Sequence, residues 1–255
     1  AGMEAARIAA MRGHRVSLYE KDSTLGGQLI VASKGPTTSD IQKLIDYLIR
    51  QIQDLGVAIH TGVTINPELI SQENPDVVII ATGSKPICPE IPGVKGENVM
   101  LARDVLMGKM TAGNRVVVVG GGLVGMEASL VLTKQGKSVA LIEMLPKIGV
   151  NANTLELVSL MGCLIEEDVR ILTNTKLLSI HPDGILVTMK QLTNENEVLF
   201  IKADSVVIAM GYRSSEDLSQ SVRGSGRPVY VIGDSKEARK IIDAIHEGYQ
   251  TALAI

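Results

Sequence analysis

The chain has 255 residues, of which 45% are hydrophobic, yet it contains one Phe, five Tyr and no Trp, so its core must be aliphatic. The 25 glycines and the Val/Ile-rich runs are typical of an α/β protein with buried parallel strands. The net charge of −3 is dispersed, and the lack of a basic stripe together with the scarcity of aromatic residues excludes the usual kinds of nucleic-acid-binding surface.

Membrane insertion and metal binding are not indicated by the sequence. The longest apolar run, Val116 to Val124, is interrupted by glycine and stops before Glu127, far short of a membrane span. The cysteines, Cys88 and Cys163, form neither a CxxC motif nor a metal-ligand spacing. Two lone thiols suit a reducing compartment, so we expect a cytoplasmic protein.

The N-terminal segment repeats a segment in the middle of the chain. Gly2-Met3-Glu4-Ala5 matches Gly125-Met126-Glu127-Ala128, an offset of 123 positions (125 − 2), and at this offset Glu20 matches Glu143. The second copy is preceded by a strand-like run and two further glycines, whereas the first copy has neither. The sequence therefore predicts that the chain is cut within its first nucleotide-binding motif and that its first strand is missing.

The next elements are a helix and two strands. Asp40 to Leu55 has Ile and Leu at helical spacing, with Ser39 or Asp40 as the expected cap and Gly56 as the end. Val57 to His60 and Val77 to Ala81 read as strands.

The central motif carries the strongest functional signal. The β-branched run Arg115 to Val119 leads into Gly120-Gly121-Gly122-Leu123-Val124-Gly125, and the next expected strand, Ser138 to Ile142, ends at Glu143. A strand, GxGxxG, a helix, a second strand and a terminal acid form the fingerprint of dinucleotide binding. The first glycine allows the tight turn, the second lets the backbone approach a pyrophosphate, and the third allows helix and strand to pack closely. The helix that starts near Val124 would direct its free N–H groups at the phosphates.

The remaining chain reads as short strands and a final helix. Several β-type runs between Val169 and Ala203, with a turn at 182–184, predict a meander. Val206 to Ala209 and Val229 to Ile232 read as strands. Gly233-Asp234 follows the last strand, and a helix is expected from about Glu237 to the end.

These motifs, in this order, resemble the flavoproteins with two dinucleotide-binding domains, the group that includes glutathione and thioredoxin reductases. The resemblance spans essentially the whole chain and implies an α/β fold with two Rossmann-like domains, the second inserted in the first. It further implies a discontinuous FAD-binding domain over 1–106 and 213–255, truncated at its N-terminus, and an NAD(H)-binding domain over 107–212.

A narrower likeness rests on Gly26-Gly27-Gln28-Leu29, the segment Val169 to Thr175, and Gly233-Asp234 with the segment Glu237 to Ile245. These look like the C-terminal half of NADH:flavin oxidoreductases: 2-enoate reductases, 2,4-dienoyl-CoA reductases and trimethylamine dehydrogenase. That resemblance implies a preceding barrel domain of the same parent chain, which would hold FMN and a 4Fe-4S cluster and would reduce an enoate- or enoyl-CoA-type substrate.

The resemblance implies roles for residues of the first site. Glu20 would accept hydrogen bonds from the adenosine ribose of FAD, Val63 would meet the adenine, and Asp234 would bond the ribityl chain. The full expected FAD-binding set is Gly2, Glu20, Lys21, Gly26, Gly27, Gln28, Leu29, Val63, Ala81, Thr82, Gly83, Gly233 and Asp234.

In the second site, Glu143 governs the choice of nicotinamide cofactor. A carboxylate at this position pairs with a ribose 2′-hydroxyl and repels a 2′-phosphate, and Lys147 is the only nearby cation, so NADH is favoured over NADPH. The expected set is Gly120, Gly122, Leu123, Val124, Gly125, Glu143 and Gly211, the last allowing the nicotinamide half to approach.

Three functions remain open at this point. The first is an electron-input module in which NADH reduces FAD, and for this the sequence identifies no catalytic acid or base. The second is a non-catalytic module that holds only ADP, as the equivalent region of trimethylamine dehydrogenase does. The third is a free-standing reductase of a disulfide or small carrier, which would need a redox CxxC that the sequence lacks. His14, His60, His181 and His246 show no spacing for a triad or a metal site, so we expect them to be structural.

Overall fold

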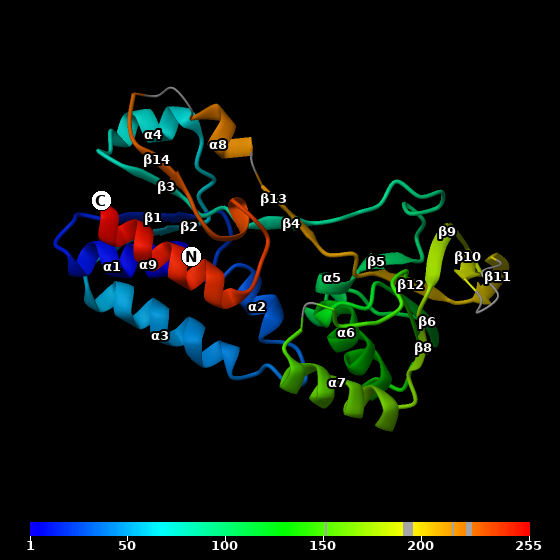
Figure 1. The fold of residues 1–255 in the computed structure, drawn as a ribbon. Helices are drawn as coiled ribbons and strands as arrows, with labels where there is room; N and C mark the ends of the chain where they lie inside the picture. The colour runs from blue at the N-terminus through cyan, green and yellow to red at the C-terminus, as the bar shows by residue number, and fades with distance from the viewer. Residues whose placement is uncertain (151, 191–195, 216, 223–225) are drawn as a thin grey trace. The chain divides into compact units, whose positions relative to one another are not determined.

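The computed structural model describes residues 1–150, 152–190, 196–215, 217–222 and 226–255 (Figure 1). The chain divides into two compact units. Unit 1 comprises Ala1–Ser33, Asp40–Lys85 and Tyr212–Ile255, and unit 2 comprises Lys34–Ser39 and Pro86–Gly211. The longer segment of unit 2 thus begins at Pro86, before the boundary expected near residue 106, because β5 (Val99–Leu101) belongs to the main sheet of unit 2.

The strands of unit 1 form two separate parallel pairs. β1 (Ser17–Glu20) pairs with β2 (Ala58–Thr61), and β3 (Val78–Ile80) pairs with β14 (Val229–Val231). Helix α1 (Gly2–Met11) contacts both β1 and β3 and buries Ala5, Ala6, Ile8 and Ala9 in the cores on either side. In the described part of the chain no strand joins β1 to β3. The expected strand ahead of Ala1 stays a prediction.

The longer helices of unit 1 follow the predicted pattern, with two differences at their N-termini. α3 (Ile41–Asp54) is confirmed and buries Ile45, Leu48 and Ile52, but the side chain of its N-cap residue Asp40 pairs with the Lys43 amine and makes no cap hydrogen bond. α9 (Ile241–Ala254) begins later than expected, because the 3-10 turn η1 (Gly233–Ser235) and a non-helical stretch up to Lys240 precede it. The shorter helices are α2 (Gln28–Ala32), α4 (Pro67–Glu73) and α8 (Asp217–Ser221).

Unit 2 is built on a five-stranded parallel sheet, and this confirms the expected α/β class. Its strand order is β5, β12 (Ser205–Ile208), β6 (Arg115–Val119), β7 (Ser138–Ile142) and β8 (Arg170–Leu172). The central strands are buried on both faces, which explains their unbroken runs of Val and Ile. The helices of this unit are α5 (Ala102–Leu106), α6 (Leu123–Lys134) and α7 (Thr154–Glu166).

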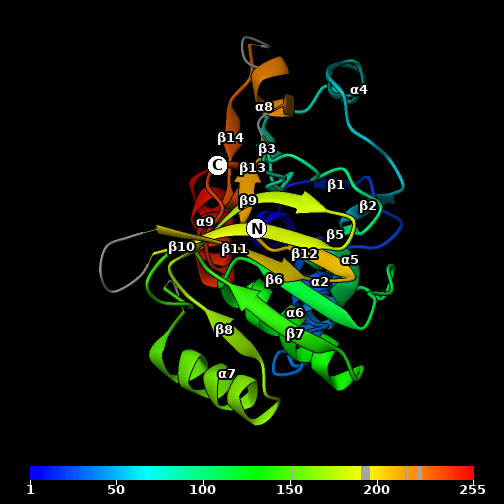
Figure 2. The same ribbon diagram turned by 90° about the vertical axis from the view of Figure 1, so that its right-hand side faces the viewer.

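The expected meander is confirmed as a three-stranded antiparallel sheet of β9 (Thr175–His181), β10 (Gly184–Lys190) and β11 (Asn196–Lys202) (Figure 2). Its apolar side chains, such as Ile185 and Val187, share one core with Val117 and Val119 of β6. Because side chains alternate along a strand, Val116 and Val118 point to the opposite face of the sheet. Part of the predicted meander region, residues 191–195, lies outside the described residues.

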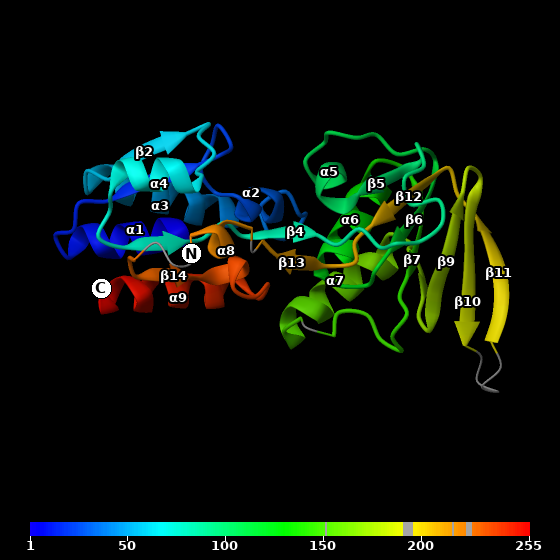
Figure 3. The same cartoon turned by 90° about the horizontal axis from the view of Figure 1, so that it is seen from above.

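Two short strands, β4 (Ser84–Pro86) and β13 (Tyr212–Ser214), pair with each other where the chain passes between the units (Figure 3). None of the helices in the described part of the chain has the length and apolar character needed to cross a bilayer.

Candidate dinucleotide-binding sites

In unit 2, the three fingerprint glycines meet three different environments. Gly120 has φ +111°, and an added Cβ would lie 2.4 Å from the carbonyl oxygen of Ala209. A Cβ on Gly125 would lie 1.9 Å from the carbonyl oxygen of Gly120, so helix α6 can pack on the β6 turn only without a side chain there. A Cβ on Gly122 would meet nothing within 4 Å. Gly122 therefore leaves an open approach to the backbone, which is the feature a pyrophosphate requires.

Helix α6 starts beside this opening. Gly122 is its N-cap residue in extended conformation, and no side chain caps the helix. Leu123 and Val124, both partly exposed, form the first turn. The first N–H groups of a helix have no partner within the helix, and together with the helix dipole they favour an anion.

Glu143 lies at the carboxyl end of β7, the strand next to β6. Its Oε2 accepts the N–H of Gly121 at 2.8 Å, and its Oε1 accepts the N–H of Leu145 at 2.8 Å. The carboxylate therefore holds the middle of the glycine loop. A carboxylate has about four lone-pair directions, so two remain for ribose hydroxyls.

Gly211, the last predicted residue of this unit, follows β12 at the same edge of the sheet. Its φ is +88°, and its carbonyl accepts the N–H of Ile87 at 2.9 Å. The structure thus places every predicted residue of the second site at the carboxyl ends of β6, β7 and β12, where ligands of open parallel sheets bind.

In unit 1, the predicted adenosine residues come together at the ends of β1 and β2. The Val63 N–H donates to the Glu20 carbonyl at 3.0 Å, and the Glu20 carboxylate accepts the N–H of Asp22 at 3.0 Å. Lys21 lies exposed between them. Gly2, at the start of α1, sits against Ala81 at the end of β3, since an added Cβ would lie 3.2 Å from the Ala81 Cβ.

A second group of predicted residues is joined by Ser84, which the sequence did not single out. The Gln28 Nε2 donates to the Ser84 Oγ at 2.5 Å, and the Ser84 hydroxyl donates to the Asp234 Oδ2 at 3.0 Å. Three distant parts of the chain thus meet at one hydroxyl. Ser84 directly follows the Ala-Thr-Gly motif, so its place was predictable, but its partners depend on the tertiary fold.

The glycines around this group adopt backbone conformations that residues with a side chain rarely adopt. Gly26, Gly27, Gly83 and Gly233 all have positive φ, and the Leu29 N–H closes a turn onto the Gly26 carbonyl at 3.1 Å. The Thr82 hydroxyl donates to the carbonyl of Ser215 at 3.3 Å.

One buried carboxyl group of unit 2 was not predicted as functional. Glu127, on α6, is 7% exposed. Burial raises its pKa to about 7, the Thr38 hydroxyl that donates to it acts in the opposite direction, and the charge of Glu156 adds to the rise. Gly35 lies so close that an added Cβ would be 2.7 Å from the Glu127 Oε1. The sequence used Glu127 only as a marker of the repeat.

The described contacts of His60 and His181 are local ones, with residues of their own sheets. His181 bonds Ser179 at 2.9 Å and meets Phe200 edge-on, while His60 stacks on Tyr19. Within the described ranges, no group of three or more His, Cys, Asp and Glu side chains could hold a metal ion.

Comparison with known proteins gives a consistent result. The family model described as pyridine nucleotide-disulphide oxidoreductase matches residues 1–248. An NADH oxidase of Thermoanaerobacter brockii is 39% identical over 260 residues, covering 100% of this chain and 39% of that protein. A cinnamate reductase of Clostridium sporogenes is 35% identical over 261 residues, covering 100% of this chain and 38% of that protein.

A solved structure of 2-naphthoyl-CoA reductase in complex with 2-naphthoyl-CoA superposes with a TM-score of 0.93 at 32% identity. The match covers 99% of this chain and 38% of that one. The chain therefore spans about two-fifths of the length of these three relatives. These matches confirm the resemblance predicted from the motifs.

Proposed function

Because the chain belongs to the pyridine nucleotide-disulphide oxidoreductase family, an FAD- and NAD(P)H-dependent class, we propose that it is the module through which NADH delivers electrons to FAD in a larger flavoprotein. The observation that carries the proposal is the geometry of the fingerprint. Gly120 and Gly125 are required by close packing, and Gly122 is open to a ligand beside the uncapped start of α6.

Unit 2 suits NADH at this opening. The pyrophosphate would lie against the backbone of Gly122 and the first turn of α6 at Leu123 and Val124, where N–H groups and the helix dipole favour negative charge. Gly120 and Gly125 would shape this turn, and Gly211 would border the nicotinamide half.

The carboxylate of Glu143 supports NADH over NADPH. Its oxygens can still accept hydrogen bonds from ribose hydroxyls while they hold the N–H groups of Gly121 and Leu145. A 2′-phosphate would place two negative groups side by side at this position. The nearby Lys147 is exposed and forms no ion pair with Glu143 in the described part of the chain, so it does not neutralise this carboxylate.

Unit 1 offers a complementary set for FAD at the carboxyl ends of its parallel pairs. Glu20 and Val63 would hold the adenosine half, as their mutual hydrogen bond supports. Asp234, oriented by Ser84, would bond the ribityl hydroxyls. The remaining residues proposed for this site are Gly2, Lys21, Gly26, Gly27, Gln28, Leu29, Ala81, Thr82, Gly83 and Gly233.

The chemistry that such cofactors supply is the transfer of a hydride from the nicotinamide to the flavin ring. The chain itself contributes binding, orientation and electrostatics. We assign no proton-transfer residue, because the hydride step requires none.

The onward acceptor belongs to the larger protein. We propose a barrel domain with FMN and a 4Fe-4S cluster, which would reduce an enoate- or enoyl-CoA-type substrate. The proposal is supported by relatives that are about two and a half times longer than the matched region and that bear the names cinnamate reductase and 2-naphthoyl-CoA reductase.

Equilibrium binding tests the cofactor assignment. Calorimetric titration of the chain with NADH, NADPH, ADP and FAD should show NADH binding more tightly than NADPH, and FAD binding at a separate site with its own stoichiometry. Binding of ADP and FAD in competition for a single site, with no separate NADH site, would favour the ADP-holding module and contradict the proposal.

A further inference from the structure

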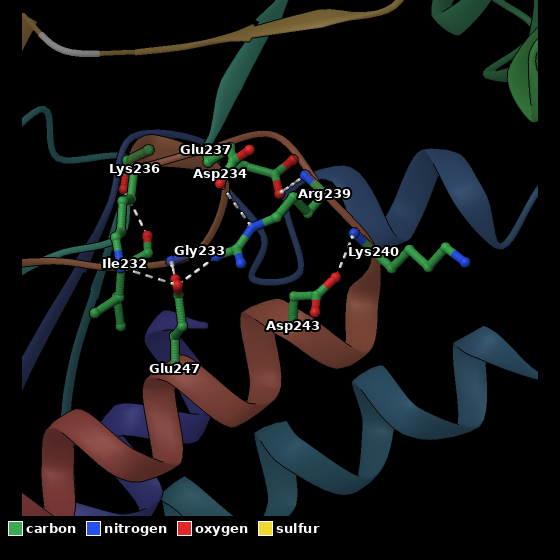
Figure 4. Close-up of polar contacts among 10 residues, drawn as sticks. Ile232, Gly233, Asp234, Lys236, Glu237, Arg239, Lys240, Asp243 and Glu247 are labelled. Atoms are coloured by element: carbon green, nitrogen blue, oxygen red, sulfur yellow. Dashed lines mark hydrogen bonds and ion pairs between the residues drawn. The ribbon is translucent and has the colours of Figure 1, made fainter. Parts of the chain in front are cut away.

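The turn that presents Asp234 is anchored from helix α9 by Glu247 (Figure 4). Gly233 has φ +60° and is buried, so its N–H points into the protein rather than to solvent. The Glu247 Oε2 accepts this N–H at 2.7 Å. Glu247 is itself only 18% exposed. One carboxylate oxygen therefore satisfies the buried donor that opens the Gly233–Asp234 turn.

The other oxygen of Glu247 gathers two cations from the same loop. The Lys236 Nζ donates to Oε1 at 3.2 Å, and the Arg239 guanidinium donates to the same oxygen. Both cations follow the turn within a few residues, as the labelled side chains of Figure 4 show. The loop from Gly233 to Arg239 is thus tied to α9 at both of its ends.

The loop closes on Asp234 itself. The Arg239 N–H donates to the Asp234 Oδ1 at 3.4 Å, while the Ser84 hydroxyl donates to the Oδ2 at 3.0 Å. Arg239 therefore connects the two carboxylates: its side chain bonds Glu247 and its backbone bonds Asp234. Where Glu247 holds Arg239, the orientation of Asp234 is restricted.

We infer that Glu247 is a positioning residue of the flavin site, which fixes the Gly233–Asp234 turn so that Asp234 faces the ribityl hydroxyls of FAD. This inference rests on the proposed function. Glu247 contacts no reacting atom; it acts through Gly233 and Arg239.

A charged carboxylate is required for this role. Three donors converge on Glu247, and two of them are cationic, so charge-assisted bonds dominate. Burial opposes ionisation of Glu247, but the donors from Gly233, Arg239 and Lys236 outweigh it and lower its pKa, so it stays charged at neutral pH. A glutamine would keep the shape and would supply one acceptor, but it would leave Lys236 without a carboxylate partner in the described part of the chain and Arg239 with Glu237 alone.

Asp243 offers a matched control on the same helix. Its Oδ2 accepts the N–H of Lys240 at 3.1 Å and caps α9, but it contacts neither Gly233 nor Arg239 in the structure (Figure 4). Asp243→Asn should thus weaken the helix without releasing the turn, whereas Glu247→Gln should release the turn.

The test compares backbone amide exchange and FAD affinity in the wild type, Glu247→Gln and Asp243→Asn. Glu247→Gln should speed exchange at Gly233 and Arg239 by about tenfold or more and weaken FAD binding by about tenfold, with a shifted flavin absorption band. Asp243→Asn should change neither. Equal exchange in Glu247→Gln and wild type would overturn the inference, as would an equal loss of FAD affinity in both variants.

The two readouts separate this inference from the proposed function. If the wild-type chain binds no FAD, the proposed flavin site fails, while the exchange measurement still decides whether Glu247 fixes the turn. If the wild type binds FAD and Glu247→Gln binds it equally well with an unchanged spectrum, the flavin site stands and the positioning role of Glu247 is refuted.

Discussion

The carboxylate of Glu143 accepts the backbone N–H of Gly121 at 2.8 Å, so the residue that would choose the nicotinamide cofactor also holds the loop that would bind its phosphates. Glu143 can serve both cofactor choice and the loop because β6 and β7 are neighbours in the sheet and both end at this edge. A change of cofactor preference at this position therefore carries a cost in the geometry of the loop.

Glu143→Gln separates charge from hydrogen bonding. The amide oxygen can still accept one N–H, but the negative charge that repels a 2′-phosphate is gone. We expect NADH affinity to fall by about tenfold and the preference for NADH over NADPH to narrow by a similar factor, since charged hydrogen bonds contribute about 1.5–3 kcal/mol. Calorimetry with both cofactors measures the ratio, and an unchanged ratio would refute the assignment of Glu143.

Alanine should have different effects at two glycines of the fingerprint: at Gly125 it should lower stability, and at Gly122 it should weaken NADH binding. Gly125→Ala would place a methyl 1.9 Å from the Gly120 carbonyl oxygen, so α6 would have to move and unit 2 should lose about 2 kcal/mol or more of stability. Gly122→Ala meets open space and should leave stability within about 0.5 kcal/mol, yet its methyl would occupy the approach of the pyrophosphate.

Chemical denaturation and NADH titration together check this pair. Gly162→Ala, within α7, is the control: an added Cβ there would meet nothing within 4 Å, so the substitution should raise stability by about 0.5–1 kcal/mol without changing NADH affinity. Tight NADH binding by the Gly122→Ala variant would show that the nucleotide does not approach this backbone.

Ser84 is predicted to matter for FAD and not for NADH. Ser84→Ala removes the hydroxyl that links Gln28 to Asp234, so FAD affinity should fall by about fivefold to tenfold, which corresponds to the net contribution of about 1 kcal/mol that is typical of a hydrogen bond. Ser179→Ala, a substitution on the exposed surface of β9, serves as the control. Flavin absorbance titrations measure the effect; identical FAD affinity in both variants would contradict the role of Ser84.

The burial of Glu127 should make the free energy of unfolding of unit 2 depend on pH, because burial favours the protonated carboxyl group. Its pKa is raised from 4.5 to about 7, so between these values the folded state keeps a proton that the unfolded chain has released. The stabilisation that comes from this retained proton is fully present below pH 4.5 and is lost as the pH rises through 7. The free energy of unfolding should fall over this range by on the order of 3 kcal/mol at most. In Glu127→Gln this dependence should vanish.

The measurement is denaturant unfolding of the wild type and of Glu127→Gln at several pH values between pH 5 and pH 8. The difference in unfolding free energy between Glu127→Gln and the wild type should grow with pH and level off above about 7. Parallel curves over this range would mean that Glu127 is ionised in the folded protein.

The sequence predicted the elements that depend on local pattern. The β-branched run before Gly120 and the 3.6-residue spacing of Ile45, Leu48 and Ile52 each specify an element without reference to distant residues. The repeat also located Glu20 and Glu143 at equivalent strand ends. The start of α9 was placed too early, because a non-helical loop after Gly233 is held by Glu247, which is distant in sequence.

The features that the sequence did not predict depend on partners brought together by the fold. Ser84 looks like any small residue after a strand until Gln28 and Asp234 converge on it. Glu127 lies on a helix face whose burial depends on Gly35 and Thr38, which precede it by about 90 residues. Likewise, Pro86 to Leu106 joins unit 2 because β5 pairs with β12, and such long-range pairing leaves no periodic trace.

We propose that NADH bound to unit 2 reduces FAD bound to unit 1. The most direct test is an anaerobic titration of the FAD-loaded chain with NADH, in which the visible absorption band of the flavin is recorded. Stoichiometric NADH should bleach the band, and NADPH should do so only at higher concentration. A flavin band that stays oxidised while NADH is bound in full would contradict the proposal.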